Sequence, residues 1–345
     1  MKIGFQLPTG REGLSLPTPF FRASEFIPMA RAAERLGYDS IWGNDHYAPQ
    51  DYVRRTYDTL PNFWDVLVVL AAAAAATTRI QLGTSVLVLP MREIVTTAKQ
   101  IATLDQLSDG RLLLGVGVGA YREEFAAARP ELVGKDRGAM LEEGLELLNR
   151  LFTENGVTHR GQHYHVEGMD MLPKPSQRPF PILVGGHQER SLARAIRFGQ
   201  GWIPGWRPFP ELKEWIATLR ERAAEAGRDP DSLIVAPQFS CVVGRTQEEA
   251  EERYQKSAMV QHRISLAYTG RDPDLAMRNN LIGSPDVILE KLEHLRSFGV
   301  DHLAATSFCV DSPTEMSEQV HFFAEEVLYP YRRHDATAEG QTSRG

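Results

Sequence analysis

The stretch RIQLGTSVLVLPMREIVTTAKQIATLDQLSDGRLLLGVGVG, residues 79–119, contains a repeating unit that runs strand, helix, strand. Its apolar, β-branched runs at 80–89 and 111–119 predict two strands, and the segment from about Ile94 to Leu107 predicts a helix between them. Strands that are apolar on both faces and separated by helices are typical of a parallel sheet covered by helices. The block therefore predicts an α/β fold.

The same alternation extends over nearly the whole chain. Further strands are expected at 2–8, 40–46, 182–186, 201–206, 234–244 and 302–308, and further helices at 24–36, 62–76, 137–153 and 190–199. Eight such strands are the number that closes a (β/α)₈ TIM barrel. An open doubly wound sheet is the alternative, but it would place a GxGxxG motif after the first strand, and the segment LPTGREG lacks that spacing.

We expect residues 1–333 to form one barrel domain and residues 334–345 to form a flexible, polar tail. Long irregular stretches at about 155–181 and 258–282 interrupt the alternation. Loops of this length inside a compact domain are usually functional or disordered. We therefore expect loop insertions at the C-terminal mouth of the barrel, where barrel enzymes carry out their chemistry.

Composition excludes several classes of protein. The chain has 345 residues, of which 42% are hydrophobic and 24% charged, and its net charge of -7 argues against nucleic-acid binding. Cys241 and Cys309 lack the spacing of a redox or zinc motif. The apolar run at 66–76 is too short to span a bilayer, and the N-terminus lacks a signal-peptide pattern. We expect a cytoplasmic protein that acts on a small molecule, without a membrane or nucleic-acid partner.

Candidate catalytic residues follow the second expected strand. Asn44, Asp45 and His46 fall at its C-terminal end, which is the catalytic end of a barrel strand. A histidine beside a carboxylate can transfer protons near neutral pH, so His46 and Asp45 are the catalytic candidates. The alternative is that Asp45 caps a turn and His46 is a structural hydrogen-bond donor.

Two neighbouring strands offer room for a planar ligand. Small Thr84 and Ser85 precede bulky Val86 in the third strand, a pattern that would let a ring approach the backbone and would support its face, although ordinary core packing explains it equally well. In the fourth strand three glycines alternate on one face, which indicates close approach of a ligand or of a neighbouring backbone. These glycines are Gly115, Gly117 and Gly119, and Tyr121 follows them as one of the aromatic residues expected at the mouth.

The fifth strand carries the clearest signal for an anion site. Gly185 and Gly186 precede a helix that begins near Arg190, so free backbone amides and the helix dipole can bind phosphate, with Arg190 as an added donor. A plain tight turn is the alternative. His159, His163 and His165 lack a carboxylate or cysteine that would complete a metal site, so no metal is expected. GxSxG and HExxH motifs of hydrolases are also absent from the sequence.

Taken in order, these segments resemble the bacterial-luciferase-like superfamily of flavin- and deazaflavin-dependent oxidoreductases. The resemblance rests on IWGNDHY at 41–47, on the block at 79–119, on MLPKPSQRPFPILVGGHQERSLARA at 171–195 and on GWIP at 201–204. Their order and separations match those of the family over nearly the whole barrel.

The resemblance implies roles for individual residues. It implies a non-proline cis peptide at Ser85–Val86 or at Thr84–Ser85, in a bulge of the third strand that faces the ring of the cofactor. It places Asp45 and His46 beside that ring. It also implies a homodimer and assigns the cofactor phosphate to the turn formed by Gly185, Gly186 and His187.

The choice of cofactor rests on finer motifs. Reduced-FMN monooxygenases of the family often end the fourth strand in Asn-Val-Val-Thr-Ser, whereas deazaflavin relatives share the Asp-His pair and the GVGxG run found here. The resemblance thus favours coenzyme F420 and hydride transfer. FMN, a partner reductase and oxygenation by O₂ are the alternative, and a non-catalytic flavin-binding barrel is a lesser one. Sugar-phosphate dehydrogenases of the family carry Glu after GVGxG, but this chain has Ala120, which argues against that activity.

Overall fold

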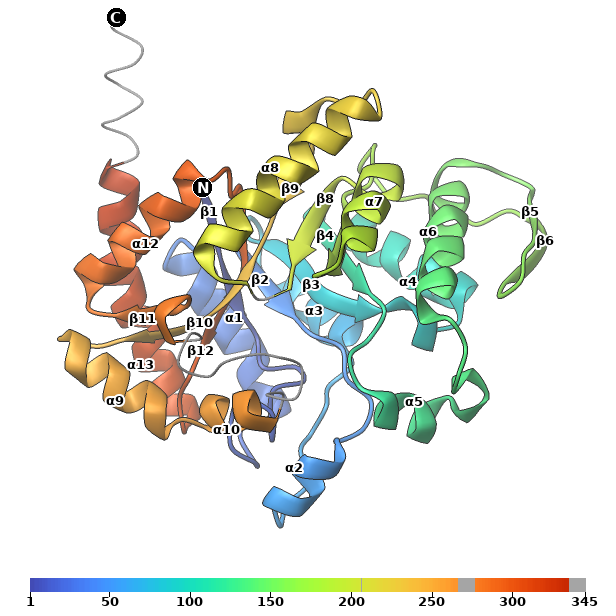
Figure 1. Cartoon of the computed structure of the whole chain (residues 1–345). Helices are drawn as coiled ribbons and strands as arrows, with labels where there is room; N and C mark the ends of the chain where they lie inside the picture. The colour runs from blue at the N-terminus through green and yellow to red at the C-terminus, as the bar shows by residue number, and fades with distance from the viewer. Residues whose placement is uncertain (206, 266–276, 335–345) are drawn as a thin grey trace, which may run out of the picture.

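The computed structural model describes residues 1–205, 207–265 and 277–334. Within them, ten parallel strands form a curled sheet in the order β11-β10-β12-β1-β2-β3-β4-β7-β8-β9 (Figure 1). The strands are β1 (Lys2–Gln6), β2 (Ser40–Gly43), β3 (Gln81–Val88), β4 (Leu112–Gly117), β7 (Ile182–Gly186), β8 (Gly201–Pro204), β9 (Ile234–Val235), β10 (Gln238–Val243), β11 (Leu281–Gly283) and β12 (His302–Phe308).

The sheet closes on itself at β9 and β10, which divide the single strand predicted at 234–244. The division falls next to Pro237, which has no amide hydrogen to donate to a neighbouring strand. β9 pairs with β8, and β10 pairs with β12. Asp301 N donates to Val235 O at 3.0 Å, and Ala304 N donates to Pro237 O at 2.9 Å. The predicted (β/α)₈ barrel is confirmed, with β11 as an unpredicted strand beside β10.

Helices cover the outer face of the sheet, as the alternating pattern predicts. They are α1 (Phe26–Arg35), α3 (Val66–Ala76), α4 (Ile94–Leu107), α6 (Arg137–Thr153), α7 (Glu189–Phe198), α8 (Phe209–Glu225), α9 (Gln247–Lys256), α12 (Pro285–Ser297) and α13 (Pro313–Phe323). Helix α3 begins later than predicted because Asp65 caps it, its carboxylate accepting from Leu67 N and Val68 N. In the described part of the chain, no helix is long and apolar enough to cross a membrane.

Shorter helices lie at the end of the barrel where the strands finish, at the lower edge of Figure 1. They are α2 (Asp51–Thr56), α5 (Arg122–Ala128) and α10 (Ala258–Ser265). The stretch at 258–282 was expected to be irregular, but its first part forms α10 and its last part enters β11, while 266–276 lie outside the described residues. The insertion at 155–181 contains the hairpin of β5 (Val157–Arg160) and β6 (His165–Met169). The expectation that it lies at the mouth is wrong, because the hairpin is attached to α6, away from α2, α5 and α10 (Figure 1). Most of the predicted tail, 335–345, also lies outside the described residues.

The two faces of each strand pack into different layers of the core. In β4, Leu113 packs inside the barrel with Trp42 and Ile203, whereas Leu112 and Leu114 pack outward beneath the helices. This alternation follows from the two-residue repeat of a strand. This inner layer fills the inside of the barrel with side chains, which leaves the end where the strands finish as the place for a ligand.

Asp105, near the end of α4, fixes the segment that leads into β7. Its side chain is fully buried and accepts hydrogen bonds from Ser176 N at 2.6 Å, Ser176 Oγ at 2.7 Å and Gln177 Nε2 at 2.7 Å. Gln177 Nε2 also donates to Leu112 O in β4 at 2.8 Å. A single carboxylate therefore connects α4, β4 and the approach to β7.

We expect Asp105→Asn to lower the free energy of unfolding by about 2–3 kcal/mol, because the new amide group would face donors and leave them unpaired. The matched control is Asp109→Asn, four residues along the chain. Asp109 is exposed and has φ 53°, a conformation that asparagine tolerates, so its substitution should change stability by less than about 0.5 kcal/mol. Urea unfolding measures both, and equal losses would contradict the assigned role of Asp105.

Candidate active site

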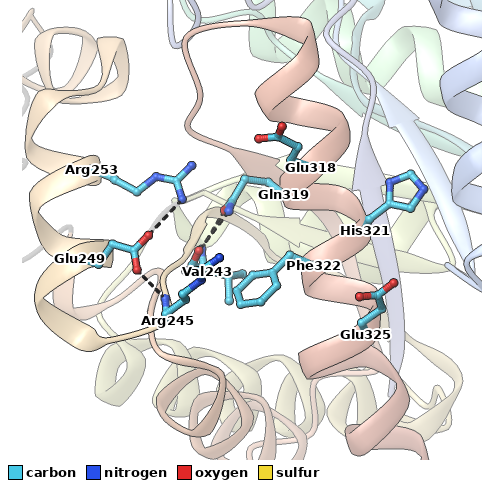
Figure 2. Close-up of a pocket in the computed structure, with 9 residues that line it drawn as sticks. All are labelled: Val243, Arg245, Glu249, Arg253, Glu318, Gln319, His321, Phe322 and Glu325. Atoms are coloured by element: carbon cyan, nitrogen blue, oxygen red, sulfur yellow. Dashed lines mark hydrogen bonds and ion pairs between the residues drawn. The ribbon is translucent and has the colours of Figure 1, made fainter.

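A wide groove on the described surface lies between α9 and α13, on the outside of the barrel (Figure 2). Its volume is about 680 Å³. Several of its polar groups bind one another: Arg253 lies 3.8 Å from Glu249, and Glu249 accepts from Arg245 N at 2.9 Å. The residues singled out by the sequence do not line it. The candidate active site lies instead at the C-terminal ends of the strands, where barrel enzymes bind their ligands.

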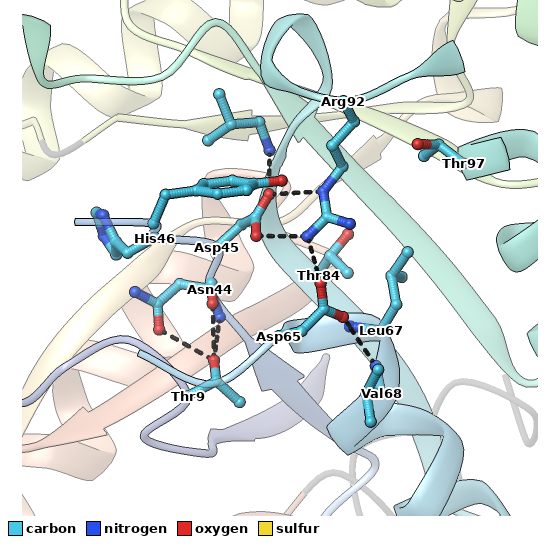
Figure 3. Close-up of polar contacts among 12 residues, drawn as sticks. Thr9, Asn44, Asp45, His46, Asp65, Leu67, Val68, Thr84, Arg92 and Thr97 are labelled. Atoms are coloured by element: carbon cyan, nitrogen blue, oxygen red, sulfur yellow. Dashed lines mark hydrogen bonds and ion pairs between the residues drawn. The ribbon is translucent and has the colours of Figure 1, made fainter. Parts of the chain in front are cut away.

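Asn44 joins the loop after β2 to the loop after β1 (Figure 3). Its backbone N donates to Thr9 Oγ1 at 2.9 Å, and Thr9 Oγ1 donates to Asn44 O at 2.7 Å. The side-chain amide of Asn44 donates to Gly10 O at 2.8 Å. Both loops are thereby held together at the rim, and the position of the next two residues, Asp45 and His46, is set by this contact.

Asp45 forms a buried ion pair with Arg92, which follows β3 (Figure 3). The Nε and Nη2 atoms of Arg92 donate to Asp45 at 3.0 and 2.7 Å, and Val88 N donates to the same carboxylate at 3.0 Å. Arg92 Nη2 also donates to Asp65 at 3.0 Å. Burial opposes the charge of Arg92, but the hydrogen bond and charge of Asp45 outweigh it and raise the pKa of Arg92. Asp45 therefore connects the ends of β2 and β3.

His46 is oriented by a carboxylate that the sequence analysis did not identify. His46 Nδ1 lies 3.0 Å from Glu124 Oε1 of α5, and the same oxygen accepts from Tyr47 N at 3.0 Å. The Glu124 side chain is buried, whereas 15% of the His46 side chain is exposed. The rings of Phe63 and Tyr121 lie 5.4 and 5.8 Å from that of His46. With Nδ1 engaged, Nε2 is the ring nitrogen left for a ligand.

Strand β3 bulges at the Ser85–Val86 peptide bond, which is cis as the resemblance implies. The register of β3 against β4 shifts between Thr84 and Leu87. At this point the strands approach so closely that a Cβ on Gly115 would lie 2.0 Å from Thr84 O. Only glycine fits at that position.

The other glycines accommodate Val86 itself. A Cβ on Gly117 or on Gly185 would lie 2.7 or 2.8 Å from the Val86 side chain, and Gly119, with φ +77°, lies against Val88. Of the two explanations offered for the glycines of β4, close approach of a neighbouring strand is thus the one observed. Val86 remains partly exposed while Ser85 and Leu87 are buried, so its side chain can contact a ligand.

The turn after β7 is anchored at the rim of the barrel. Gly186 O accepts from Trp202 Nε1 at 3.0 Å. The N-cap residue of α7, Gln188, forms no side-chain capping hydrogen bond, so the amides of Glu189 and Arg190 can bind an anion, whereas Ser191 N already donates to Gln188 O at 2.8 Å. The side chains of His187 and Arg190 are exposed beside these amides. The assignment of the cofactor phosphate to Gly185, Gly186, His187 and Arg190 stays a prediction.

Residues 1–302 match the family described as luciferase-like monooxygenase. The chain belongs to this family. The F420-dependent glucose-6-phosphate dehydrogenase of Intrasporangium calvum is 33% identical over 306 residues, which cover 82% of this chain and 88% of that protein. Monooxygenase RslO1 from Streptomyces bottropensis is 26% identical, with a TM-score of 0.79 and coverage of 96% of this chain and 100% of RslO1.

A further solved structure shares the fold at lower identity. An F420-dependent secondary alcohol dehydrogenase, in complex with an F420-acetone adduct, is 20% identical, with a TM-score of 0.75 and coverage of 96% and 98% of the two chains. The luciferase-like chain described here is therefore an oxidoreductase whose relatives include both F420-dependent dehydrogenases and monooxygenases.

The positions of His46, Asp45 and the bulge were predicted from the sequence. Two side chains that bind His46 and Asp45 were not. Arg92 directly follows the strand expected at 80–89, and its place at the same barrel end as Asp45 is a signal that could have been used. Glu124 lies 78 residues from His46 in a short helix that was not predicted, and we see no sequence signal for it.

A carboxylate of α6 binds the hairpin that carries the histidines. His159 Nε2 pairs with Glu143 Oε1 at 3.1 Å, and Glu143 accepts from His163 N and Tyr164 N as well. No group of three or more potential metal ligands occurs among the described residues. The hairpin is thus attached to α6 by Glu143, whose carboxylate accepts hydrogen bonds from backbone amides of the hairpin.

We expect Arg92→Met to lower the free energy of unfolding by about 3–5 kcal/mol, because Asp45 would remain buried without its cation. Arg160→Met is the control: Arg160 pairs with Glu167 on the exposed hairpin, so its loss should cost about 0–1 kcal/mol. Adding Asp45→Asn to Arg92→Met should recover part of the loss in urea unfolding. Equal costs for Arg92→Met and Arg160→Met would show that the buried pair does not hold the rim.

Proposed function

We propose that this luciferase-like chain is an F420-dependent oxidoreductase that transfers hydride between a small organic substrate and a deazaflavin at the barrel mouth. The proposal rests on two features of neighbouring strands at the rim. One is His46, which Glu124 holds through Nδ1, and the other is the bulge at Val86. The GVGVG run and the F420-dependent relatives at 33% identity favour the deazaflavin over FMN.

Buried polar atoms near the strand ends fit the edge of such a ring. The amide of Gln6 in β1 and the hydroxyls of Ser85 in β3 and Thr306 in β12 are buried and have no hydrogen-bond partner among the described residues. Buried polar groups are normally paired, so three such groups indicate a ligand that offers its own donors and acceptors. The carbonyl and N–H groups of a flavin or deazaflavin ring supply these.

Each part of the site has a role in this proposal. Val86 would support the face of the ring, and the first turn of α7 with Arg190 would hold the phosphate. When bound, the deazaflavin supplies the two-electron hydride acceptor or donor. His46 Nε2 takes the proton from the substrate hydroxyl, or returns it in the reverse direction, while Glu124 orients the imidazole. Asp45 acts by positioning, because both of its oxygens are already bound to Arg92.

Oxygenation with reduced FMN is the second candidate, and the monooxygenase RslO1 at 26% identity favours it. That chemistry would require a separate reductase to supply the reduced flavin, and His46 would then protonate the oxygenated intermediate or product. Titrating the protein in parallel with oxidised F420 and, with oxygen consumption followed, with reduced FMN distinguishes the two candidates, and binding of neither would contradict both.

We expect Arg190→Glu to weaken F420 binding about tenfold, because a negative charge would replace a positive one at the phosphate turn. Arg197→Glu is the matched control, since Arg197 is exposed on the same helix but lies in its last turn. Both variants change the net charge equally, so general electrostatic effects cancel. Quenching of F420 fluorescence measures the affinities, and an unchanged affinity for Arg190→Glu would remove this turn from the site.

We expect His46→Gln to lower turnover by about 100-fold or more with little change in stability, because glutamine is polar and of similar size but cannot transfer the proton. The control is His165→Gln on the exposed face of β6, which should leave turnover unchanged. Stopped-flow reduction of bound F420 by an alcohol substrate measures the rate. A His46→Gln variant with the wild-type rate would exclude His46 from the reaction.

A further inference from the structure

A small polar cavity opens at the barrel mouth beneath α10. It has a volume of about 160 Å³ and lies among the ends of β8 and β12, the first residues of β10 and the loop after β1. Its polar lining comprises Arg11, Gln238, Ser240, His262, Arg263 and Ser307. Two of these residues are arginines, and none of the described residues that line the cavity is acidic. The cavity therefore has the chemistry of an anion site.

Arg11 has no counter-ion among the described residues. No ion pair of its guanidinium is found there, and its Nε is buried without a hydrogen-bond partner. Burial lowers the pKa of Arg11 to about 10; Tyr121 opposes this shift, and the positive charge of Arg263 adds to it. Arg11 is thus still charged at neutral pH. The Arg11 side chain as a whole is only partly buried, so its charge faces the cavity without a partner, and an anion that enters the cavity can pair with it.

The backbone holds Arg11 in place and close to His46. Arg11 O accepts from the backbone amides of Leu14, Ser15 and Leu16 at 3.0–3.1 Å, which fixes the turn that carries it. The preceding residue is Gly10, and a Cβ there would lie only 3.0 Å from His46 Cδ2. The cavity and the candidate catalytic histidine therefore belong to one mouth.

We propose that this cavity binds an anionic group of the substrate, a carboxylate, sulfonate or phosphate, against Arg11. The reacting carbon of the substrate then lies between the cavity and His46. Ser240 and Ser307 supply hydroxyl donors for the remaining anion oxygens. This inference rests on the proposed function, since it names the substrate class of the same site, and it assigns the cofactor phosphate to a different place, the turn after β7.

The first test needs no ligand. We expect Arg11→Met, which keeps much of the side-chain volume, to raise the melting temperature of the protein, because it removes an unpaired positive charge close to that of Arg263 and a buried Nε without a partner. Arg160→Met on the exposed hairpin is the control and should leave the melting temperature nearly unchanged. A lower melting temperature for Arg11→Met would show that Arg11 stabilises the fold and would overturn the proposal.

The second test uses inorganic phosphate as the probe, with the protein saturated in oxidised F420 so that the turn after β7 is filled. Phosphate should raise the melting temperature of the wild type and of Arg160→Met, and its affinity for Arg11→Met should fall at least about tenfold. F420 affinity should be the same in all three proteins, which distinguishes a substrate site from a cofactor site. Loss of F420 affinity in Arg11→Met would assign the cavity to the cofactor and overturn the proposal.

Failure of the two proposals gives different results. A wild type that binds F420 but shows the same phosphate response as Arg11→Met, or none, contradicts the anion cavity and leaves the cofactor assignment intact. A wild type that binds no F420 contradicts the proposed function, and the phosphate titration is then made without cofactor. In that case a response lost only in Arg11→Met supports the cavity, and a response retained in Arg11→Met refutes it.

Discussion

The shape of the mouth depends on the close approach of β3 to β4 and β7 at Val86. The distance of 2.0 Å between Thr84 O and a Cβ built on Gly115 shows that any larger residue would push the strands apart. Gly117 and Gly185 then receive the Val86 side chain. Because protein interiors are close-packed, a bulge of this kind persists only where its neighbours are small enough to accept it. The bulge therefore requires these glycines, because the space beside them is filled by Thr84 and Val86.

Two polar pairs at the rim have different roles. One holds the strand ends together, and the other provides the group proposed to transfer a proton. Asp45 and Arg92 bind each other and connect two strand ends, and both of Asp45's oxygens are occupied. His46 and Glu124 form the second pair, in which one ring nitrogen is held and the other remains for a ligand. Arg11 completes the mouth with a positive charge whose partner has to arrive with the substrate.

Eight barrel strands and the helices α1, α3, α4, α6 and α7 could be predicted from the alternation of apolar runs, whereas α8, α9, α12, α13 and β11 were not predicted. The position of His46 at the end of β2 could be predicted because it directly follows the apolar run of that strand. Partners such as Glu124 could not, because the contact joins residues 78 positions apart and depends on the path of α5. Helix α10 was missed since its amphipathic pattern is short, and the break at Pro237 was missed although proline removes a strand donor.

The most direct test is a crystal structure of the protein with oxidised F420. The account predicts that the deazaflavin ring lies against Val86 at the Ser85–Val86 bulge, that His46 Nε2 faces the reacting edge of the ring, and that the phosphate contacts the first amides of α7. A ring bound away from Val86, or one with its reacting edge turned away from His46, would contradict the account.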